Sequence, residues 1–278
     1  MPLLPAERQG FWESTITTAE SAPIATLRTS GYVVTTLQAA WRTVTVTAEI
    51  EGAAHLEAAL RQAVGIGGDT DTVAAIAGAL LGARFGASAV PFSWRRRLGG
   101  WPPELGHRDL VAMGVLAASK GTDDSIGWPS ADDLMPYYER SWRPRGHAVE
   151  LRDHPGVIWG DVAGLAHADA NAFVSLCRIG KGQWRGVDHH EVWLMDGDDN
   201  ADLAFVLSDT ADAVEELRRE HGSVFVHCVQ AESRTPAVAV AWLIRHHGLD
   251  LDKAFAEVQR ALPASQPKAA MLAALRAM

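Results

Sequence analysis

One stretch near the carboxyl end constrains the fold more than any other part of the chain. Residues 223–228, SVFVHC, form a short apolar run typical of a buried β-strand, and residues 235–248, TPAVAVAWLIRHHG, have the pattern of a helix that ends at a glycine. Only five residues separate Cys228 from Arg234, so the connection is a short loop. Such a junction directs backbone N–H groups and the positive end of a helix dipole at one point, where an anion can bind.

The side chains of this loop suit phosphate chemistry. The N–H groups and the helix dipole stabilise a thiolate at Cys228, and Arg234 offers a planar guanidinium that can hold two phosphate oxygens. The Thr235 hydroxyl can hydrogen-bond the thiolate, and Pro236 suits a first helical turn. A lone cysteine at a strand end is more often a buried apolar residue, but the spacing to Arg-Thr-Pro favours a phosphate-binding loop.

The stretch VFVHCVQAESRTPAVAVAWLI resembles the signature of the cysteine-dependent protein phosphatases, and most of all their dual-specificity branch. In that family His-Cys, five residues, Arg and Ser or Thr lie between a strand and a helix. Upstream, NAFVSLCRIG resembles the family's VVSLCR strand, and VWLMDGDDNADL resembles the segment that carries its general acid. The resemblance covers about residues 150–278 and implies a protein phosphatase that acts on phosphotyrosine or phosphoserine/threonine in protein substrates.

The resemblance also implies a role for each matching residue. Cys228 would attack phosphorus to give a phosphocysteine, Asp196 would protonate the leaving oxygen and later activate water, and Thr235 would assist departure of the thiolate. His227 would orient the loop by hydrogen bonding. The reaction would need no metal or other cofactor. The Arg234 side chain and the loop N–H groups would bind phosphate, which adds Val229, Gln230, Ala231, Glu232 and Ser233 to the site.

Two loop residues depart from the family pattern. Ala231 stands where the family usually has glycine, and its methyl group disfavours a positive φ. Glu232 places a carboxylate near the anion site, where a like charge repels phosphate. Both leave open a different class of function, a phosphate-binding module without turnover. Asp198 and Asp199 compete with Asp196 as the acid, but the position of Asp196 matches the family best.

The amino-terminal third has the pattern of helices between residues 31 and 86. The last of these helices carries apolar residues at helical spacing that would face a core: Val73, Ile76, Ala77, Leu80 and Leu81. The turn GIGGDTDT precedes it. Asp69, Asp71 and Thr72 in this turn can be helix-capping residues, or they can be oxygen ligands suited to magnesium.

This region resembles the carboxyl-terminal part of the ADP-ribosylglycohydrolases, a helical family with two magnesium ions. Its Asp-x-Asp-Thr element matches Asp69, Asp71 and Thr72, over about residues 25–105. The resemblance implies an alternative function, a magnesium-dependent ADP-ribosyl hydrolase. The family's amino-terminal half, which supplies further ligands to the same ions, has no counterpart in the sequence, so half of the metal site is missing. A partner is one way to complete the helical region. The GTDDS segment offers further ligands, but its Gly- and Pro-rich setting favours a linker turn over a role for Thr122, Asp123 and Asp124.

The expected architecture is α + α/β. A partial glycohydrolase-like helical region would span residues 1–108, a linker residues 109–150, and an α/β domain residues 151–278 with a mainly parallel central sheet flanked by helices. The boundary follows from the Gly- and Pro-rich segment RRRLGGWPPELG. Cys228 would then lie at the carboxyl end of a strand, where ligands gather in such sheets.

Composition limits the remaining function classes. The net charge of −9 disfavours a nucleic-acid partner, and no apolar run reaches about 18 residues, so we expect no membrane partner. The amino terminus lacks the features of a secretory signal, which favours the cytoplasm. Of the two cysteines, we expect Cys177 to be core packing. The pair His189 and His190 has no ligand partner at metal-binding spacing, so a surface or strand-edge position is expected.

Overall fold

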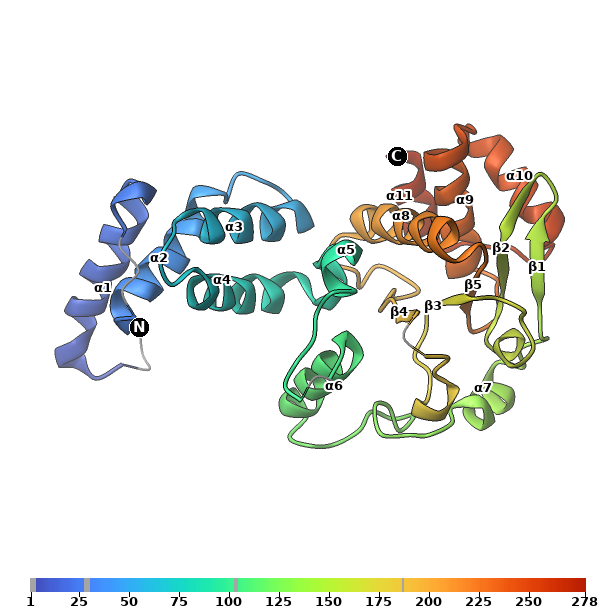
Figure 1. Cartoon of the computed structure of the whole chain (residues 1–278), viewed down its shortest axis with the longest axis horizontal. Helices are drawn as coiled ribbons and strands as arrows, with labels where there is room; N and C mark the ends of the chain where they lie inside the picture. Colours follow the sequence, from blue (N-terminus) through green and yellow to red (C-terminus); the bar gives the residue numbers. More distant parts are fainter. Residues whose placement is uncertain (1–3, 28–30, 103–104, 187) are drawn as a thin grey trace. The chain divides into compact units, whose positions relative to one another are not determined.

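The computed structural model describes residues 4–27, 31–102, 105–186 and 188–278. The chain divides into two compact units, Met1–Val90 and Pro91–Met278, which are drawn from blue to cyan and from cyan to red in Figure 1. Within the described ranges, no helix combines the length and the apolar character that crossing a membrane requires.

The first unit is helical in its described part. Its elements are α1 (Ala6–Ser21), a 3-10 turn (Ile24–Thr26), α2 (Val33–Val46), α3 (Ala53–Gly65), α4 (Thr70–Phe85) and a second 3-10 turn (Ala87–Ala89).

Small residues hold α2, α3 and α4 together. Ala39 and Ala40 of α2 and Ala63 of α3 pack on Val73 and Ala77 of α4, and all five are fully buried. Alanine lets helix axes approach closely, so the shared core is compact and contains few large side chains. The predicted apolar stripe is buried along the row Val73, Ala77 and Leu81. In the adjacent row, Ile76 is half-buried and packs against the same cluster, whereas Leu80 is exposed.

The second unit is an α/β layer. Its helices are α5 (Phe92–Arg95), α6 (His107–Ala118), α7 (Met135–Ser141), α8 (Leu203–His221), α9 (Arg234–His247), α10 (Leu251–Ala261) and α11 (Ala269–Arg276). Its strands are β1 (Ala148–Leu151), β2 (His154–Asp161), β3 (Ala172–Ser175), β4 (His189–Glu191) and β5 (Val224–Cys228), with 3-10 turns at Val162–Ala166 and Lys181–Gln183.

The sheet has the order β1-β2-β5-β3-β4, and only the edge strand β1 runs antiparallel to its neighbour. The central strand β5 is buried throughout, which explains its continuous apolar sequence. Side chains alternate along it. Val224, Val226 and Cys228 join the core cluster formed with α8, α9, α10 and α11, whereas Phe225 joins a second cluster on the side of α7 (Figure 1). The predicted mainly parallel sheet flanked by helices is therefore confirmed.

The limit between the units differs from the predicted boundary at residue 108. Phe92 is buried in the second unit, and its N–H donates to the Asp209 carboxylate of α8 at 2.8 Å. The Arg95 guanidinium pairs with the same carboxylate at 2.7 Å. These contacts between residues far apart in the sequence place the unit limit between Val90 and Pro91.

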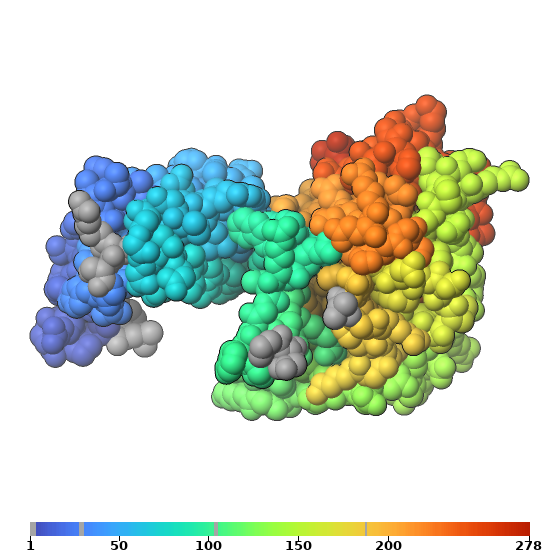
Figure 2. All heavy atoms as spheres, viewed as in Figure 1, coloured from blue at the N-terminus to red at the C-terminus, as the bar shows by residue number. Residues whose placement is uncertain are grey.

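The predicted linker 109–150 is also packed into the second unit. It contains α6, α7 and the fully or nearly fully buried side chains of Trp128, Leu134 and Tyr138. Figure 2 shows this green part of the chain lying against the later yellow segment. Its many Gly, Pro and Asp residues form tight turns between anchored aromatic side chains. The segment is therefore structured, and it is not a free connection.

We predict that Asp209→Ala destabilises the second unit by about 3 kcal/mol or more, because it leaves the buried Arg95 guanidinium without its counter-charge. The matched control is Asp212→Ala on the same helix, whose pair with Arg245 is exposed and should cost less than about 1 kcal/mol. Urea unfolding followed by tryptophan fluorescence measures both. Equal losses in the two variants would contradict this account of how α5 is attached.

Candidate active site

Cys228 ends the central strand and lies at the floor of a cavity. It pairs in register with Asp161 of β2, and the preceding His227 pairs with Ser175 of β3, so the carboxyl ends of three parallel strands meet here. Its side chain is 3% exposed, and α9 begins six residues later at Arg234. The strand, short loop and helix that the sequence predicts are therefore present in that order.

The backbone of the loop offers unused donors. Within the described ranges, no acceptor receives a hydrogen bond from the N–H groups of residues 229–234. The last two of these residues cap and begin α9, where the first N–H groups of a helix have no partner inside it. Buried N–H groups without partners are costly, so a run of them around one cysteine is the feature expected of an anion site.

Arg234 is pinned beside this loop from one side. Its Nη1 donates to the Leu176 carbonyl at 2.8 Å and to the Leu194 carbonyl at 3.3 Å. Its Nε is buried and has no hydrogen-bond partner among the described residues. Burial opposes the charge, but Cys228 and other nearby acidic groups favour it, so the pKa of Arg234 lies above its ordinary value. The guanidinium is thus a fixed cation with donors to spare.

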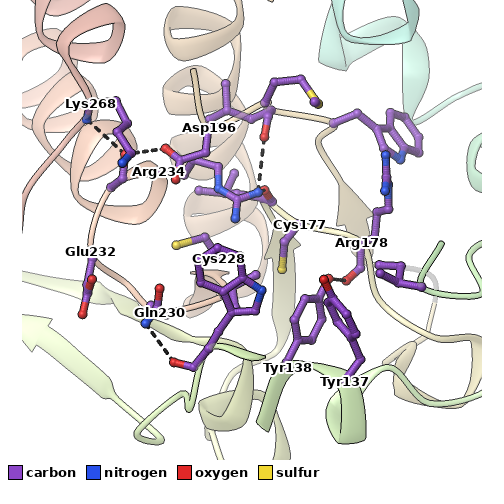
Figure 3. A pocket seen from close by; sticks show the side chains of 18 of the residues that line it. Tyr137, Tyr138, Cys177, Arg178, Asp196, Cys228, Gln230, Glu232, Arg234 and Lys268 are labelled. Atoms are coloured by element: carbon purple, nitrogen blue, oxygen red, sulfur yellow. Dashed lines mark hydrogen bonds between the residues drawn. The ribbon is translucent and has the colours of Figure 1, made fainter. Parts of the chain in front are cut away.

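A cavity of about 700 Å³ opens above Cys228 and Arg234 (Figure 3). One wall is aromatic and carries Tyr137 and Tyr138 of α7, Trp142 just after it, and Trp193. Sequence reasoning missed this wall, because three of the four residues lie in the predicted linker. The YYERSW run was the available signal, since aromatic residues at helical spacing in a Gly- and Pro-rich segment indicate an anchored face.

Asp196 lies at the mouth of this cavity. Its Oδ1 accepts a hydrogen bond from the Ser233 hydroxyl at 2.5 Å, and the Ser233 oxygen accepts from the Lys268 N–H at 3.2 Å (Figure 3). Asp198 and Asp199 do not line the cavity. Of the three carboxylates that the sequence offers as the general acid, Asp196 is the one that lies beside the loop. Sequence reasoning did not foresee that Ser233 holds it there.

The remaining predicted side chains lie behind the loop. His227 is fully buried, and its Nδ1 is 3.4 Å from the Cys228 carbonyl oxygen. Burial lowers the pKa of His227 to about 4, so the ring is neutral near pH 7. Thr235 is also fully buried, and its hydroxyl donates to the Gly160 carbonyl of β2 at 3.1 Å. The sequence predicts a hydrogen bond from this hydroxyl to the Cys228 thiolate. In the structure the hydroxyl instead ties α9 to β2.

Ala231 adopts the conformation that its methyl group disfavours. Its φ is +57°, in the left-handed region, at a cost of about 1–2 kcal/mol for a residue with a Cβ. The side chain is buried in the core cluster that also holds Cys228. The loop therefore reaches the glycine-like geometry with alanine in place.

Glu232 lines the cavity without approaching the guanidinium. Its backbone carbonyl accepts from the Gln266 N–H at 2.6 Å. Figure 3 shows its side chain directed away from Arg234. The carboxylate therefore lies off the expected anion position, and the repulsion expected from the sequence is reduced.

Cys177 is buried in the second core cluster, as predicted, and it also borders the cavity. Burial raises the pKa of its thiol, which keeps that thiol protonated. His189 and His190 lie on the edge strand β4, in agreement with the strand-edge alternative, and His189 is buried there, with 1% exposed. His246 and His247 end α9.

The glycine–aspartate turn of the first unit does not form a complete magnesium site. The Thr72 hydroxyl donates to Asp69 Oδ1 at 2.8 Å, and Asp71 is exposed. Across the described residues, no three or more His, Cys, Asp or Glu side chains cluster as metal ligands. Asp69, Asp71 and Thr72 therefore stay the partial set of oxygen ligands that the sequence indicates.

The GTDDS segment forms a turn in the second unit. Asp124 accepts hydrogen bonds from the Ile126 and Trp128 N–H groups, each at 2.9 Å, and pairs with Arg178 at 2.6 Å. Asp123 accepts from the Ser130 N–H. These carboxylates hold the wall of the cavity, in agreement with the predicted turn.

We predict that Ala231→Val lowers the free energy of unfolding by about 2 kcal/mol or more, because a β-branched residue tolerates positive φ poorly. Ala231→Gly should change it by less than about 1 kcal/mol. Glycine removes the strain of the positive φ, about 1–2 kcal/mol. It also loses the burial of one methyl group, about 0.8 kcal/mol, and it loses more conformational entropy on folding, so the effects nearly cancel. Urea unfolding tests both, and a valine variant as stable as the parent would overturn the assigned backbone conformation.

Comparisons with known proteins match the two regions separately. Residues 5–124 match the family model for ADP-ribosylglycohydrolase, and residues 176–278 match the model for the catalytic domain of dual specificity phosphatases. The first match confirms the resemblance of the helical region and extends past the structural limit at Val90.

Individual relatives belong to the second family. Human dual specificity phosphatase 28 is 36% identical over 124 residues, which cover 42% of this chain and 70% of the relative. The mouse protein of that name is 41% identical over 75 residues, or 27% of this chain and 46% of the relative, so the matched part spans less than half of that protein. A crystal structure of human DUSP28 is 28% identical, covers 48% of this chain and 93% of the other, and has a TM-score of 0.43. Through its carboxyl-terminal region, the chain belongs to the dual specificity phosphatase family.

Proposed function

We propose that this protein is a cysteine-dependent protein phosphatase that hydrolyses phosphate monoesters through a phosphocysteine at Cys228. The observation that carries the proposal is that the N–H groups of residues 229–234, which follow Cys228 and continue into Arg234, have no acceptor among the described residues. Membership of the dual specificity family supports the same chemistry. Phosphorylated proteins are the proposed substrates.

In the first step the Cys228 thiolate attacks phosphorus and the bond to the leaving oxygen breaks. Asp196 donates a proton to that oxygen, so the alcohol or phenol leaves neutral. The three equatorial oxygens receive hydrogen bonds from the 229–234 N–H groups and from the Arg234 guanidinium. Because these donors are already oriented and partly dehydrated, they stabilise the developing charge without reorganising.

In the second step Asp196, now a carboxylate, takes a proton from water as the water oxygen attacks the phosphocysteine. Inorganic phosphate forms and the Cys228 thiolate is released. The Ser233 hydroxyl donates to Asp196 Oδ1 at 2.5 Å, which holds the carboxylate beside the loop. It leaves the second carboxylate oxygen for proton transfer. Ser233 therefore couples the acid to the loop that binds the phosphate.

The aromatic wall supports a phosphoryl group carried on a ring. Tyr137, Tyr138, Trp142 and Trp193 border the cavity, and such faces favour stacking with an aryl group. We therefore place phosphotyrosine within the substrate range, beside phosphoserine and phosphothreonine.

Two alternatives have less support. A binding module without turnover was motivated by Ala231 and Glu232, but Ala231 adopts the required φ and Glu232 is directed away from Arg234. A magnesium-dependent ADP-ribosyl hydrolase has the match over residues 5–124 in its favour. The ligands that are present, Asp69, Asp71 and Thr72, do not complete its metal site.

We predict that the protein hydrolyses an aryl phosphate in the presence of EDTA and that Cys228→Ser abolishes turnover. Asp196→Asn should lower kcat by a factor of about 10² to 10⁴ for an alkyl phosphate, the usual value of a general acid, and by much less for a nitrophenyl phosphate, whose leaving group needs no proton. Steady-state kinetics with both substrates separate the role of Cys228 as nucleophile from that of Asp196 as general acid. Asp198→Asn is the matched control and should leave the rates near those of the parent.

Turnover that survives in Cys228→Ser would contradict the proposed nucleophile. Absence of turnover in the parent, together with magnesium-dependent release of ADP-ribose that Asp71→Ala abolishes, would favour the glycohydrolase alternative.

A further inference from the structure

A buried row of polar groups links β4 to the 229–234 loop, and the proposed mechanism does not use it. The Ser175 hydroxyl of β3 is 2.7 Å from Nε2 of His189 on β4 and 2.7 Å from Nε2 of His227 on β5. The three side chains are at most 1% exposed. The sheet order explains their meeting, because β3 lies between β4 and β5.

Both imidazoles are neutral. Burial lowers the pKa of His227 to about 4 and holds that of His189 well below its ordinary value. Around His227, Asp161 favours the cation while Arg234 opposes it. Around His189, the charges of Arg185 and Arg108 oppose the cation, and a proton on His227 or His190 would oppose it as well.

The backbone fixes where the protons lie. The Arg185 N–H donates to Nδ1 of His189 at 2.9 Å, so this nitrogen must be an acceptor. A neutral ring then carries its proton on Nε2 and donates it to the Ser175 oxygen. The hydroxyl proton of Ser175 is left to donate to Nε2 of His227. His227 must therefore carry its own proton on Nδ1.

The reverse tautomer of His227 is excluded by the same contacts. With the proton on Nε2, Ser175 would face two N–H donors, and its hydroxyl proton would lose its acceptor. The bare Nδ1 would also face the lone pairs of the Cys228 carbonyl oxygen. Both faults are costly for fully buried groups.

We propose that Ser175 and His189 are positioning residues for the 229–234 loop, since together they fix the Nδ1–H of His227 on the Cys228 carbonyl. This inference rests on the proposed function. A peptide group is planar and trans, so holding the Cys228 carbonyl on one side turns the Val229 N–H toward the opposite side. That N–H is the first donor of the loop. The contact is long, at 3.4 Å, and Nδ1 also lies 3.9 Å from the Cys177 sulfur, so its direction depends on a fixed proton.

Nitrogen-15 NMR of histidine-labelled protein tests the arrangement directly. At pH 7 the parent should show His227 protonated on Nδ1 and His189 protonated on Nε2, with signals assigned from single-histidine variants. Ser175→Ala removes the hydroxyl that links the two imidazoles, so His227 should become a mixture of both neutral tautomers. The same tautomer on both rings, or a cationic ring at either position, would overturn the proposal.

Kinetics of matched variants test the consequence. His189→Phe keeps an aromatic ring for the stack on Trp184, whose centroid is 4.5 Å away, but removes both nitrogens. It should lower kcat/KM about tenfold and weaken competitive inhibition by inorganic phosphate in parallel, as expected for one lost hydrogen bond. His189→Gln retains an acceptor and a donor and should recover most of the loss. Ser175→Ala with His189→Phe should fall no further than the worse single variant, because the two act through one chain.

Additive losses in the double variant, or an unchanged tautomer of His227 in His189→Phe, would assign these residues a purely structural role. Absence of turnover in the parent would defeat the proposed function alone. The NMR pattern would then decide the proton arrangement by itself.

Discussion

The site depends on one constraint, a run of backbone N–H groups beside a buried cysteine that find no acceptor in the described part of the chain. Residues 229–234 join the central strand to α9 too tightly to form internal hydrogen bonds. Orphaned donors of this kind cost folding free energy unless a ligand satisfies them. The neighbouring side chains are held where they can contact such a ligand. Carbonyls of Leu176 and Leu194 pin Arg234, and Ser233 carries Asp196 to the rim.

The local part of this arrangement could be predicted from the sequence. An apolar run, a five-residue gap to Arg234 and a helical pattern specify a strand, loop and helix, because each depends on neighbouring residues. Cys228 and Arg234 could be placed together on the same basis, whereas Asp196 could be added only from the family resemblance. The edge strand β1, its neighbour β2, α10, α11 and the aromatic wall could not, because their stability comes from packing between distant segments. The hydrogen bond from the Phe92 N–H to the Asp209 carboxylate is an example, since no local sequence pattern predicts it.

Two residues show where local rules gave incomplete expectations. Alanine disfavours a positive φ, yet Ala231 adopts one, because burial and the fixed ends of the loop outweigh a cost of about 1–2 kcal/mol. Thr235 was expected beside the thiolate, but its hydroxyl bonds to Gly160 across the sheet. In both cases a tertiary contact decides a choice that the residue type alone leaves open. Tertiary contacts also decide where protons lie, in the row of hydrogen bonds that runs from the Arg185 N–H through His189 and Ser175 to His227.

The central claim is that the 229–234 loop holds a phosphoryl group while Cys228 bonds to it. Mass spectrometry of protein quenched in acid during turnover of an aryl phosphate tests this most directly. The account predicts a single added phosphoryl group on the peptide that contains Cys228, absent when substrate is omitted. An unmodified Cys228 peptide during active turnover, or a phosphoryl group found on another residue, would contradict it.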